Sequence, residues 1–260
     1  MSLVEAINTT MQFGGLKAVN ELNMHIEEGE IVALIGPNGA GKTTFFNMLT
    51  GIYKPTSGEL TFAGGSVAGK KAHQICRLGI ARTFQNIRLF SNMTTLENVM
   101  VGRHTRSKAG PWQAVLRSPG FKREEKATVD AAYQRLQFVG LASSANELAK
   151  NLPYGAQRRL EIARALATDP KLLLLDEPAA GMNPQESAEL TKLVGRIRKS
   201  GVTVLLIEHD MKVVMDIADR IYVLDFGELI AEGKPEEIQK NPKVIEAYLG
   251  VGAEAMLAQA

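Results

Sequence analysis

Residues 31–43 read Ile-Val-Ala-Leu-Ile-Gly-Pro-Asn-Gly-Ala-Gly-Lys-Thr, an apolar run followed by a glycine-rich turn. The run 31–35 predicts a buried strand, and the residues from Gly41 to Leu49 show helical periodicity. Residues 36–43 satisfy G-x-x-x-x-G-K-[ST] at every fixed position. The glycines let backbone N–H groups converge on phosphate oxygens, and the helix N-terminus adds partial positive charge. This stretch therefore predicts a P-loop that binds a nucleoside triphosphate.

Two side chains at the end of this loop have defined chemistry. Lys42 can reach the β- and γ-phosphates as a point charge, and the Thr43 hydroxyl can ligate Mg²⁺. The predicted nucleotide contacts are Gly36, Pro37, Asn38, Gly39, Ala40, Gly41, Lys42, Thr43 and Thr44. Because kinases, GTPases and motors share a P-loop, other residues must decide the class of protein.

Acidic residues and a histidine follow two further apolar runs. Asp176 and Glu177 come directly after four leucines, at the end where parallel sheets bind ligands. Asp176 suits a Mg²⁺ ligand acting through the water shell, and Glu177 suits a general base that polarises the attacking water. The run 202–207 ends in the same way, so His209 would lie on the same rim and could hydrogen-bond the γ-phosphate.

Strand-sized apolar runs alternate with helical stretches such as 186–198, which predicts an α/β fold with a mostly parallel sheet covered on both faces. The runs are 31–35, 172–175, 202–207 and 221–224, and residues 3–13 predict an edge strand. Residues 224–229 predict two short strands joined at a turn. Pro235 and Asn241-Pro242 then begin helices, giving a C-terminal helical tail at about 235–260.

The middle of the chain, about 90–164, has helix signals and no convincing strand, which predicts an inserted helical subdomain. Thr94 and Glu97 form a capping box. One helix has the predicted apolar stripe Val129, Tyr133, Leu136 and Val139. Between these helices, residues 102–123 carry basic side chains and no acidic residue. This segment is either a solvated excursion or a contact surface for a partner or lipid head groups.

Composition narrows the class of protein. Thirty Lys and Arg against 28 Asp and Glu give a net charge of +2, which does not predict a nucleic-acid partner. One cysteine, Cys76, excludes an internal disulfide framework and favours a reducing cytoplasm. No apolar run approaches the roughly 18 residues of a membrane-spanning helix, and the N-terminus does not resemble a signal peptide.

Together these motifs resemble the nucleotide-binding subunits of ABC transporters, over roughly residues 3–250. The resemblance implies one ABC ATPase domain across 1–260, an N-terminal antiparallel β part, and ATP with Mg²⁺ as cofactors. It also implies that Gln85, in Ala-Arg-Thr-Phe-Gln at 81–85, touches Mg²⁺ and the attacking water. Phe13 stands where the family stacks an aromatic ring on adenine, and Asn183 falls in a loop that crosses the dimer interface.

The segment Leu152-Pro-Tyr-Gly-Ala-Gln-Arg158 matches the family signature L-S-G-G-Q imperfectly. Pro153 lacks the usual hydroxyl, although proline suits the first turn of a helix. We expect the backbone N–H groups of Tyr154, Gly155 and Ala156 to bind the γ-phosphate of ATP held by a second subunit. Losing one charge-assisted hydrogen bond costs roughly 1.5–3 kcal/mol, so slower turnover is consistent with this signature.

Four segments resemble the LivG-type ATPases of branched-chain amino-acid uptake systems. They are 13–19, 84–90, 206–212 and 244–250. This resemblance implies a peripheral subunit on the cytoplasmic face of the inner membrane. The implied partners are two integral-membrane permease subunits, a second ATPase subunit and, indirectly, a solute-binding protein, with no nucleic acid.

Alternatives remain at this point. A urea or short-amide importer, another ABC transporter, or a lipopolysaccharide exporter has the same ATPase motifs, since none of them contacts the solute. A soluble ABC ATPase acting on DNA or ribosomes usually has two cassettes or a coiled-coil insert, and neither is visible here. A P-loop kinase or GTPase leaves Gln85 and His209 unexplained. ATP binding without turnover is the last alternative, because the signature is altered.

Overall fold

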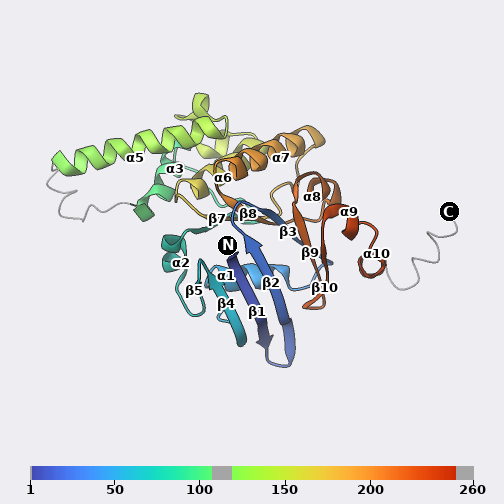
Figure 1. Ribbon diagram of the computed structural model, residues 1–260. Coiled ribbons are helices and arrows are strands. Elements are labelled where there is room, and N and C mark those ends of the chain that lie inside the picture. Colours follow the sequence, from blue (N-terminus) through green and yellow to red (C-terminus); the bar gives the residue numbers. More distant parts are fainter. Residues whose placement is uncertain (1, 107–118, 250–260) are drawn as a thin grey trace. The chain divides into compact units, whose positions relative to one another are not determined.

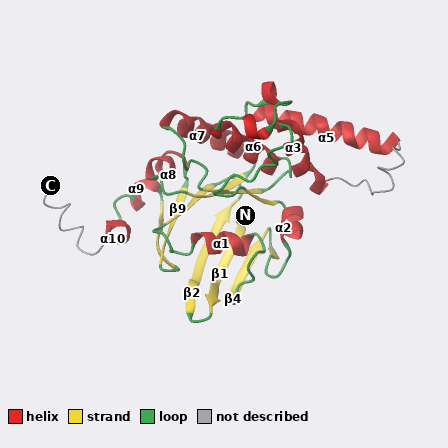
Figure 2. Ribbon diagram, turned by 180° about the vertical axis from the view of Figure 1, so that it is seen from behind, coloured by secondary structure: helices red, strands yellow, loops and turns green. Residues whose placement is uncertain are grey.

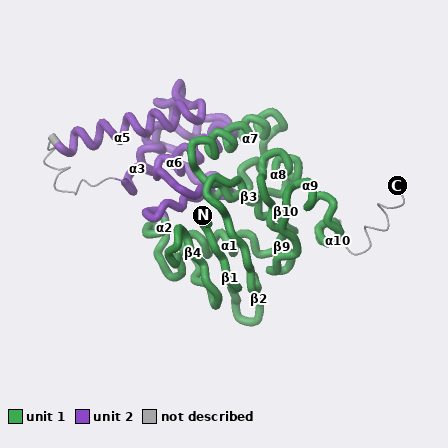
Figure 3. Tube along the Cα trace, viewed as in Figure 1, with its two compact units in different colours: residues 1–75, 174–260 green, residues 76–173 purple. Residues whose placement is uncertain are grey.

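The computed structural model describes residues 2–106 and 119–249, and the chain divides into two units (Figure 3). The first unit combines Met1–Ile75 with Leu174–Ala260, and the second is Cys76–Leu173. Most of the basic segment and the end of the C-terminal tail lie outside the described residues. Each unit is described by itself below.

An antiparallel sheet forms the N-terminal part of the first unit, in the order β2-β1-β4-β5. Its strands are β1 (Ser2–Phe13), β2 (Leu16–Glu27), β4 (Ser57–Phe62) and β5 (Gly65–Ser66). In the middle of β1, Glu5 is opposite both His25 of β2 and Thr61 of β4. Helix α1 (Lys42–Leu49) lies against one face of this sheet, as Figures 1 and 2 show from opposite sides. Residues 3–13 do form a strand, but the prediction that it is an edge strand is wrong, because β1 pairs with β2 on one side and with β4 on the other.

A second sheet forms the core of the first unit. Strand β3 (Ile31–Ile35) pairs in parallel with β8 (Thr203–Ile207) and with β9 (Arg220–Asp225), and β10 (Glu228–Gly233) is antiparallel to β9. Strand β7 (Leu172–Asp176) begins in the second unit beside β6 (Ile80–Arg82) and ends in the first unit beside β8. Every residue of β3, β7 and β8 is buried, which confirms the predicted apolar strands of a mostly parallel sheet.

Helices of the first unit follow these strands. They are α7 (Pro184–Lys199), α8 (Met211–Ile217), α9 (Pro235–Ile238) and α10 (Pro242–Leu249). Helix α7 buries Leu190, Val194 and Ile197, the face predicted from their spacing. Helix α2 (Ala72–Leu78) carries the chain from the first unit into the second.

The second unit is mainly helical. Helix α3 (Thr95–Arg103) packs against both α5 (Pro119–Phe138) and α6 (Tyr154–Leu166). Short 3-10 turns occur at His104–Arg106, Ala142–Ser144 and Ala149–Asn151. Within the described parts of the predicted insert, 90–106 and 119–164, the structure contains no strand element, as the sequence predicted. The Thr94–Glu97 capping box is present at the start of α3.

The apolar stripe predicted on α5 is wrong at one position. Leu136 is fully buried, but Tyr133 is 41% exposed, and Ala132 takes the buried place beside it. Ala132 and Leu136 are one helical turn apart, whereas Tyr133 points away from α3 and α6 far enough to reach solvent. The register of the stripe is therefore shifted by one residue at this turn.

Two basic residues of the 102–123 segment have a structural role. Arg103 and Arg135 both form ion pairs with Asp169, and Arg106 Nε donates to the carbonyl of Thr168 at 2.7 Å. These contacts tie α3 and α5 to the turn after α6. Residues 107–118 of the predicted contact surface lie outside the described residues, and its last residues, Lys122 and Arg123, lie on α5. Across the described residues, no helix is long and apolar enough to cross a membrane.

Candidate functional site

The loop between β3 and α1 requires glycine at defined places. Gly36 and Gly41 have φ angles of 146° and 100°. A Cβ added to Gly36 would come within 2.0 Å of the Leu224 carbonyl oxygen, and one on Gly41 within 2.3 Å of the Ala18 carbonyl oxygen. Gly39 has φ 83° with open space around it. The two outer glycines are therefore fixed by neighbouring backbone, while the tip of the loop stays accessible to a ligand.

The turn between β9 and β10 supports this loop. The N–H of Gly227 donates to the carbonyl of Ala40 at 3.1 Å, and the Gly227 carbonyl accepts the N–H of Asn20 at 2.8 Å. Within the loop, the N–H of Ala40 donates to the Pro37 carbonyl at 3.2 Å. Asn38, Gly39 and Thr43 are exposed, and Thr44 is half-buried at the start of α1. The backbone is thus preorganised before any nucleotide binds.

Lys42 folds back over its own loop. Its Nζ donates to the carbonyl oxygens of Gly36 at 2.6 Å and Pro37 at 2.8 Å. Burial lowers the pKa of Lys42, and the nearby negative charges of Glu177 and Asp176 partly oppose that shift. The cation and the two carboxylates therefore share one electrostatic site, as expected where phosphate and a divalent cation bind together.

The two carboxylates differ in their surroundings. Asp176, the last residue of β7, is 5% exposed. Glu177 is half-buried, has φ 46° and donates its N–H to the Ile207 carbonyl at 2.9 Å. A non-glycine residue held in the left-handed region is uncommon, and such conformations cluster at functional sites.

His209 lies beside Glu177. Its Nδ1 is 3.8 Å from Glu177 Oε2, and its side chain is 66% exposed. The expectation that His209 would share a rim with the Glu177 carboxylate agrees with this distance. An exposed imidazole next to a carboxylate is accessible to an incoming phosphate group.

Sequence reasoning gave no role to Glu208, which the structure places at the centre of this rim. Glu208 is 1% exposed, and its Oε1 accepts the Ala179 N–H at 2.7 Å. Its Oε2 accepts the N–H of His209 at 3.2 Å. Burial raises the pKa of Glu208, and the backbone hydrogen bonds partly offset that shift. The Glu208 carboxylate thus connects the segment after Glu177 with the segment that carries His209. The feature of the sequence that could have indicated Glu208 is its place directly after an all-apolar strand.

Asn183 begins the helix that follows this segment. Its side chain accepts the N–H of Glu186 at 3.0 Å, and Glu186 Oε2 accepts the N–H of Asn183 at 3.0 Å. This reciprocal capping box begins α7 directly before Pro184. Asn183 itself is exposed, so the loop before α7 presents a polar surface.

Phe13 ends β1 beside a second aromatic ring. Its ring centroid lies 5.1 Å from that of Tyr53, with an edge-to-face angle of 76°. Phe13 is 42% exposed. Phe13 is therefore in contact with Tyr53 and still partly exposed, as a ring that stacks on a planar base must be.

In the second unit, α6 begins at the altered signature. Pro153 is its N-cap, and the Pro153 carbonyl accepts the N–H of Gln157 at 2.9 Å. Helix initiation therefore survives the replacement of the usual serine, as predicted. Gly155 and Ala156 are buried in the first turn, and Tyr154 is 44% exposed. The first-turn N–H groups of Tyr154, Gly155 and Ala156 lie where an α-helix has no internal acceptor for them.

A buried arginine on α6 holds the loop that carries Gln85. The two terminal nitrogens of Arg158 donate to the carbonyls of Phe84 at 2.7 Å and Gln85 at 2.8 Å. Arg158 also pairs with Glu161 at 3.0 Å, and Glu161 accepts the N–H of Arg88 at 3.3 Å. Sequence reasoning used Arg158 only as part of the signature pattern. Its role in fixing the backbone of Gln85 depends on contacts over more than 70 residues.

The oxygen donors at the P-loop suit a hard divalent cation. Thr43 supplies a hydroxyl and Asp176 a carboxylate in the first unit, and Mg²⁺ prefers such ligands together with phosphate and water. Across the described residues, no group of three or more His, Cys, Asp or Glu side chains forms a protein-only metal cage. This set of donors fits a cation that is coordinated by a few protein side chains and by phosphate oxygens.

The glycine-rich turn, the cationic Lys42 and the paired carboxylates at the end of β7 define a P-loop nucleotide-binding protein. Residues 19–180, more than half of the chain, match the family described as ABC transporter. Residues 228–254 match the family described as branched-chain amino acid ATP-binding cassette transporter. The chain therefore belongs to the ABC transporter family, whose ATP-binding cassettes are ATPases.

Relatives with established names agree with this family. The chain is 53% identical over 241 residues to the high-affinity branched-chain amino acid transport ATP-binding protein LivG of Salmonella typhimurium, covering 92% of this chain and 94% of LivG. It is 49% identical over 249 residues to the corresponding protein BraF of Pseudomonas aeruginosa, covering 95% and 98%. The resemblance to LivG-type ATPases is confirmed.

Solved structures confirm the predicted ABC ATPase fold. The ADP conformation of MJ1267, an ATP-binding cassette of an ABC transporter, matches with TM-score 0.85 at 32% identity, covering 96% of this chain and 99% of that one. A dimeric post-hydrolysis state of the ATP-binding cassette MJ0796, bound to ADP and Pi, matches with TM-score 0.74 at 27% identity. That match covers 89% of this chain and 98% of the other.

Proposed function

We propose that this chain is the ATP-hydrolysing subunit of an ABC importer for branched-chain amino acids. The observation that carries the proposal is the joint site of Lys42, Asp176 and Glu177 in the first unit. The identity to LivG over nearly the full length of both proteins supports the choice of solute.

Several residues of the first unit have separate roles in the hydrolysis of ATP. Residues 36–44 enclose the phosphates, Lys42 neutralises their negative charge, and Phe13 stacks on adenine. Glu177 takes a proton from the attacking water as general base, and His209 donates a hydrogen bond to the γ-phosphate. Thr43, Asp176 and Gln85 are the residues that would hold Mg²⁺, which would offset phosphate charge.

A second ATPase subunit completes each site. The first turn of α6 provides the N–H groups of Tyr154, Gly155 and Ala156, which bind an anion through the helix terminus. Asn183 is exposed in the loop before α7, where it contacts the opposite subunit. ATP thus binds two subunits together, and hydrolysis releases them. The dimeric post-hydrolysis state of MJ0796 supports this arrangement.

An exposed apolar patch on the second unit is the docking surface for a permease. Phe90, Met93 and Val101 are 46%, 38% and 38% exposed. Met93 and Val101 also line a cavity of about 380 Å³, together with Glu97, Met100 and His104. We assign the helical subdomain at about 90–164 to this contact, with two integral-membrane permeases holding the chain at the cytoplasmic face of the inner membrane. A solute-binding protein delivers the amino acid on the other side.

The test is uptake of labelled leucine by vesicles that contain the co-purified complex. Tagged chain is isolated from its native membranes in mild detergent, and its partners are identified by mass spectrometry. We expect two polytopic membrane proteins and an ATPase, and ATP-dependent uptake of leucine competed by valine. Phe90→Asp should abolish uptake while basal ATP hydrolysis persists, with Tyr133→Asp on α5 as the exposed control. Uptake of urea instead of leucine would contradict the proposal that branched-chain amino acids are the solute. Recovery of only ribosomal or DNA-bound partners would contradict the proposal that the chain is part of a transporter.

A further inference from the structure

The chain after Glu177 forms two successive turns within the first unit. The N–H of Glu177 donates to the carbonyl of Ile207 at 2.9 Å, which connects the end of β7 with the end of β8. The carbonyl of Glu177 then accepts the N–H of Ala180 at 3.2 Å. The carbonyl of Ala179 accepts the N–H of Met182 at 3.1 Å. These turns carry the chain from Glu177 toward α7.

Glu208 connects these turns with the segment that carries His209. Its Oε1 accepts the N–H of Ala179 at 2.7 Å, and its Oε2 accepts the N–H of His209 at 3.2 Å. Each oxygen thus binds a backbone N–H of a different segment. A carboxylate suits this position because an amide of the same shape would direct an NH₂ group at one of the two N–H groups.

The imidazole of His209 lies near two carboxylates. Its Nδ1 is 3.8 Å from Glu177 Oε2 and 4.0 Å from Glu208 Oε2. The side chain of His209 is 66% exposed, whereas Glu208 is 1% exposed. Glu208 is therefore not open to a phosphate group, but it holds the main chain of the residue that is.

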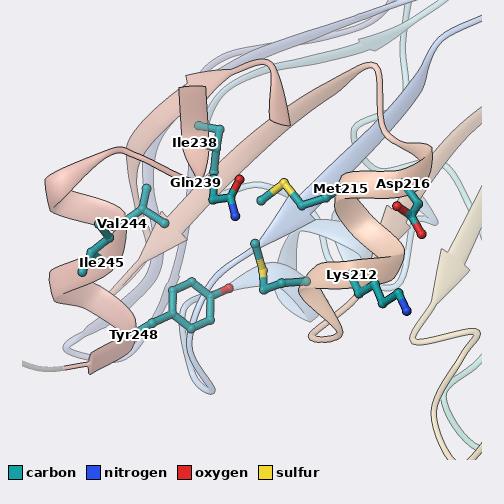
Figure 4. A pocket seen from close by; sticks show the side chains of 9 residues that line it. Lys212, Met215, Asp216, Ile238, Gln239, Val244, Ile245 and Tyr248 are labelled. Carbon is teal, nitrogen blue, oxygen red and sulfur yellow. The ribbon is translucent and has the colours of Figure 1, made fainter. Parts of the chain in front are cut away.

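The helix after His209 borders a cavity on one side. Asp210 caps the start of α8, where its side chain accepts backbone N–H groups at 2.9 and 3.4 Å. A cavity of about 500 Å³ lies between α8, α9 and α10, and Figure 4 shows Met215 and Tyr248 reaching toward it from α8 and α10. A helix face that borders a cavity makes fewer packing contacts. Packing on this side therefore adds little to the placement of His209, and the hydrogen bonds of Glu208 and Asp210 hold this segment.

We propose that Glu208 is a positioning residue for ATP hydrolysis, which holds His209 beside Glu177 and couples it to the segment 179–183. The inference rests on the proposed function, in which Glu177 and His209 act on the attacking water and the γ-phosphate and Asn183 contacts the second subunit. A displacement of the segment 179–183 on binding of that subunit reaches the main chain of His209 through one carboxylate. Glu208 thus makes turnover, and not nucleotide binding, depend on the second subunit.

Glu208→Gln tests this role with little change in side-chain volume. In the purified membrane complex, we expect a kcat for ATP hydrolysis roughly 10- to 100-fold below the wild type, because a charge-assisted hydrogen bond is lost. The KM for ATP should stay within about twofold of the wild type, because the role assigned to Glu208 is in turnover. Glu5→Gln, which changes an exposed carboxylate of β1, is the control and should match the wild type.

A double-mutant cycle separates the positioning of His209 from a general loss of structure. Rates are measured in a single turnover, with the complex in excess over radiolabelled ATP, so that slow variants remain measurable. In the His209→Ala background, Glu208→Gln should slow hydrolysis by less than about threefold, because the side chain that it positions is already absent. An equal loss in both backgrounds would overturn the inference, since Glu208 would then act independently of His209.

Amide hydrogen exchange of the same complex gives a readout that does not depend on activity. Glu208→Gln should speed exchange in residues 178–183 and 208–212, while residues 36–44 exchange as in the wild type. Faster exchange throughout the first unit would contradict the inference, because it indicates general destabilisation. A wild-type kcat, or a KM that rises as kcat falls, would also overturn it and leave the proposed ATPase function intact. Absence of ATP hydrolysis in the wild-type complex would contradict both.

Discussion

Arg158 and Glu161 form a fully buried ion pair on α6, with 3.0 Å between Nη1 and Oε2 and side-chain exposures of 0% and 1%. The same arginine binds the carbonyls of Phe84 and Gln85, so the pair connects the signature helix to the loop that carries Gln85. Both charges are satisfied only while this loop stays in place. Burial raises the pKa of Glu161, and the Arg158 charge opposes that shift.

Glu161→Ala should therefore destabilise the protein strongly. It leaves the Arg158 charge buried and without its carboxylate, which costs about 3–5 kcal/mol. Urea unfolding of the full chain measures the loss. Arg198→Ala breaks the exposed pair with Asp219, whose side chains are 38% and 41% exposed, and should cost no more than about 1 kcal/mol. Equal losses in the two variants would show that the buried pair does not hold the second unit together.

Glu208 predicts a pH dependence of stability. Burial raises the pKa of Glu208 above its ordinary 4.5. Between 4.5 and the raised value, the folded state binds more protons than the unfolded state, so the free energy of unfolding falls as the pH rises through this window. Glu208→Gln keeps an oxygen acceptor for Ala179 N–H and removes the titration. The difference in unfolding free energy, wild type minus variant, should therefore fall from pH 4.5 upward, and a rise would contradict the assignment.

Gly41→Ala should abolish nucleotide binding. The backbone has φ 100° there, and the new Cβ would meet the Ala18 carbonyl oxygen at 2.3 Å, so the loop must move. Equilibrium binding of labelled ATP measures the loss. Gly195→Ala is the matched control, because Gly195 lies within α7 with open space around it. That change should leave binding intact and raise stability by up to about 1 kcal/mol.

Phe13→Ala should weaken ATP binding through loss of the stacking surface. Stacking of a base on an aromatic ring contributes about 1–3 kcal/mol, which corresponds to roughly a 5- to 150-fold rise in Kd. Phe13→Tyr keeps the ring and should restore binding. A Kd for Phe13→Ala within twofold of the wild-type value would show that Phe13 does not stack on adenine.

The sequence predicted those features whose cause is local. Strands β3, β7 and β8 are continuous apolar runs, and the start of α3 follows from a capping box of four residues. Strand β2 was not predicted, because its half-exposed pattern becomes a strand only through pairing with β1. Tyr133 was misplaced because helical spacing fixes a face only to within about one residue.

The residues of the candidate site likewise fall into those that the sequence could predict and those that it could not. The P-loop, Asp176, Glu177 and His209 follow strand ends that can be read directly from the chain. Glu208 and Arg158 could not be assigned, because their partners are 29 and 74 residues away.

Phosphate release by the purified membrane complex, with Glu177→Gln in this chain, tests the central claim most directly. A neutral amide cannot take a proton from water, so turnover should fall at least about 10²-fold while labelled ATP still binds with wild-type affinity. Glu5→Gln, at an exposed position of β1, is the control and should hydrolyse ATP like the wild type. Near wild-type turnover in Glu177→Gln would contradict the assignment of Glu177 as general base and the hydrolytic mechanism built on it.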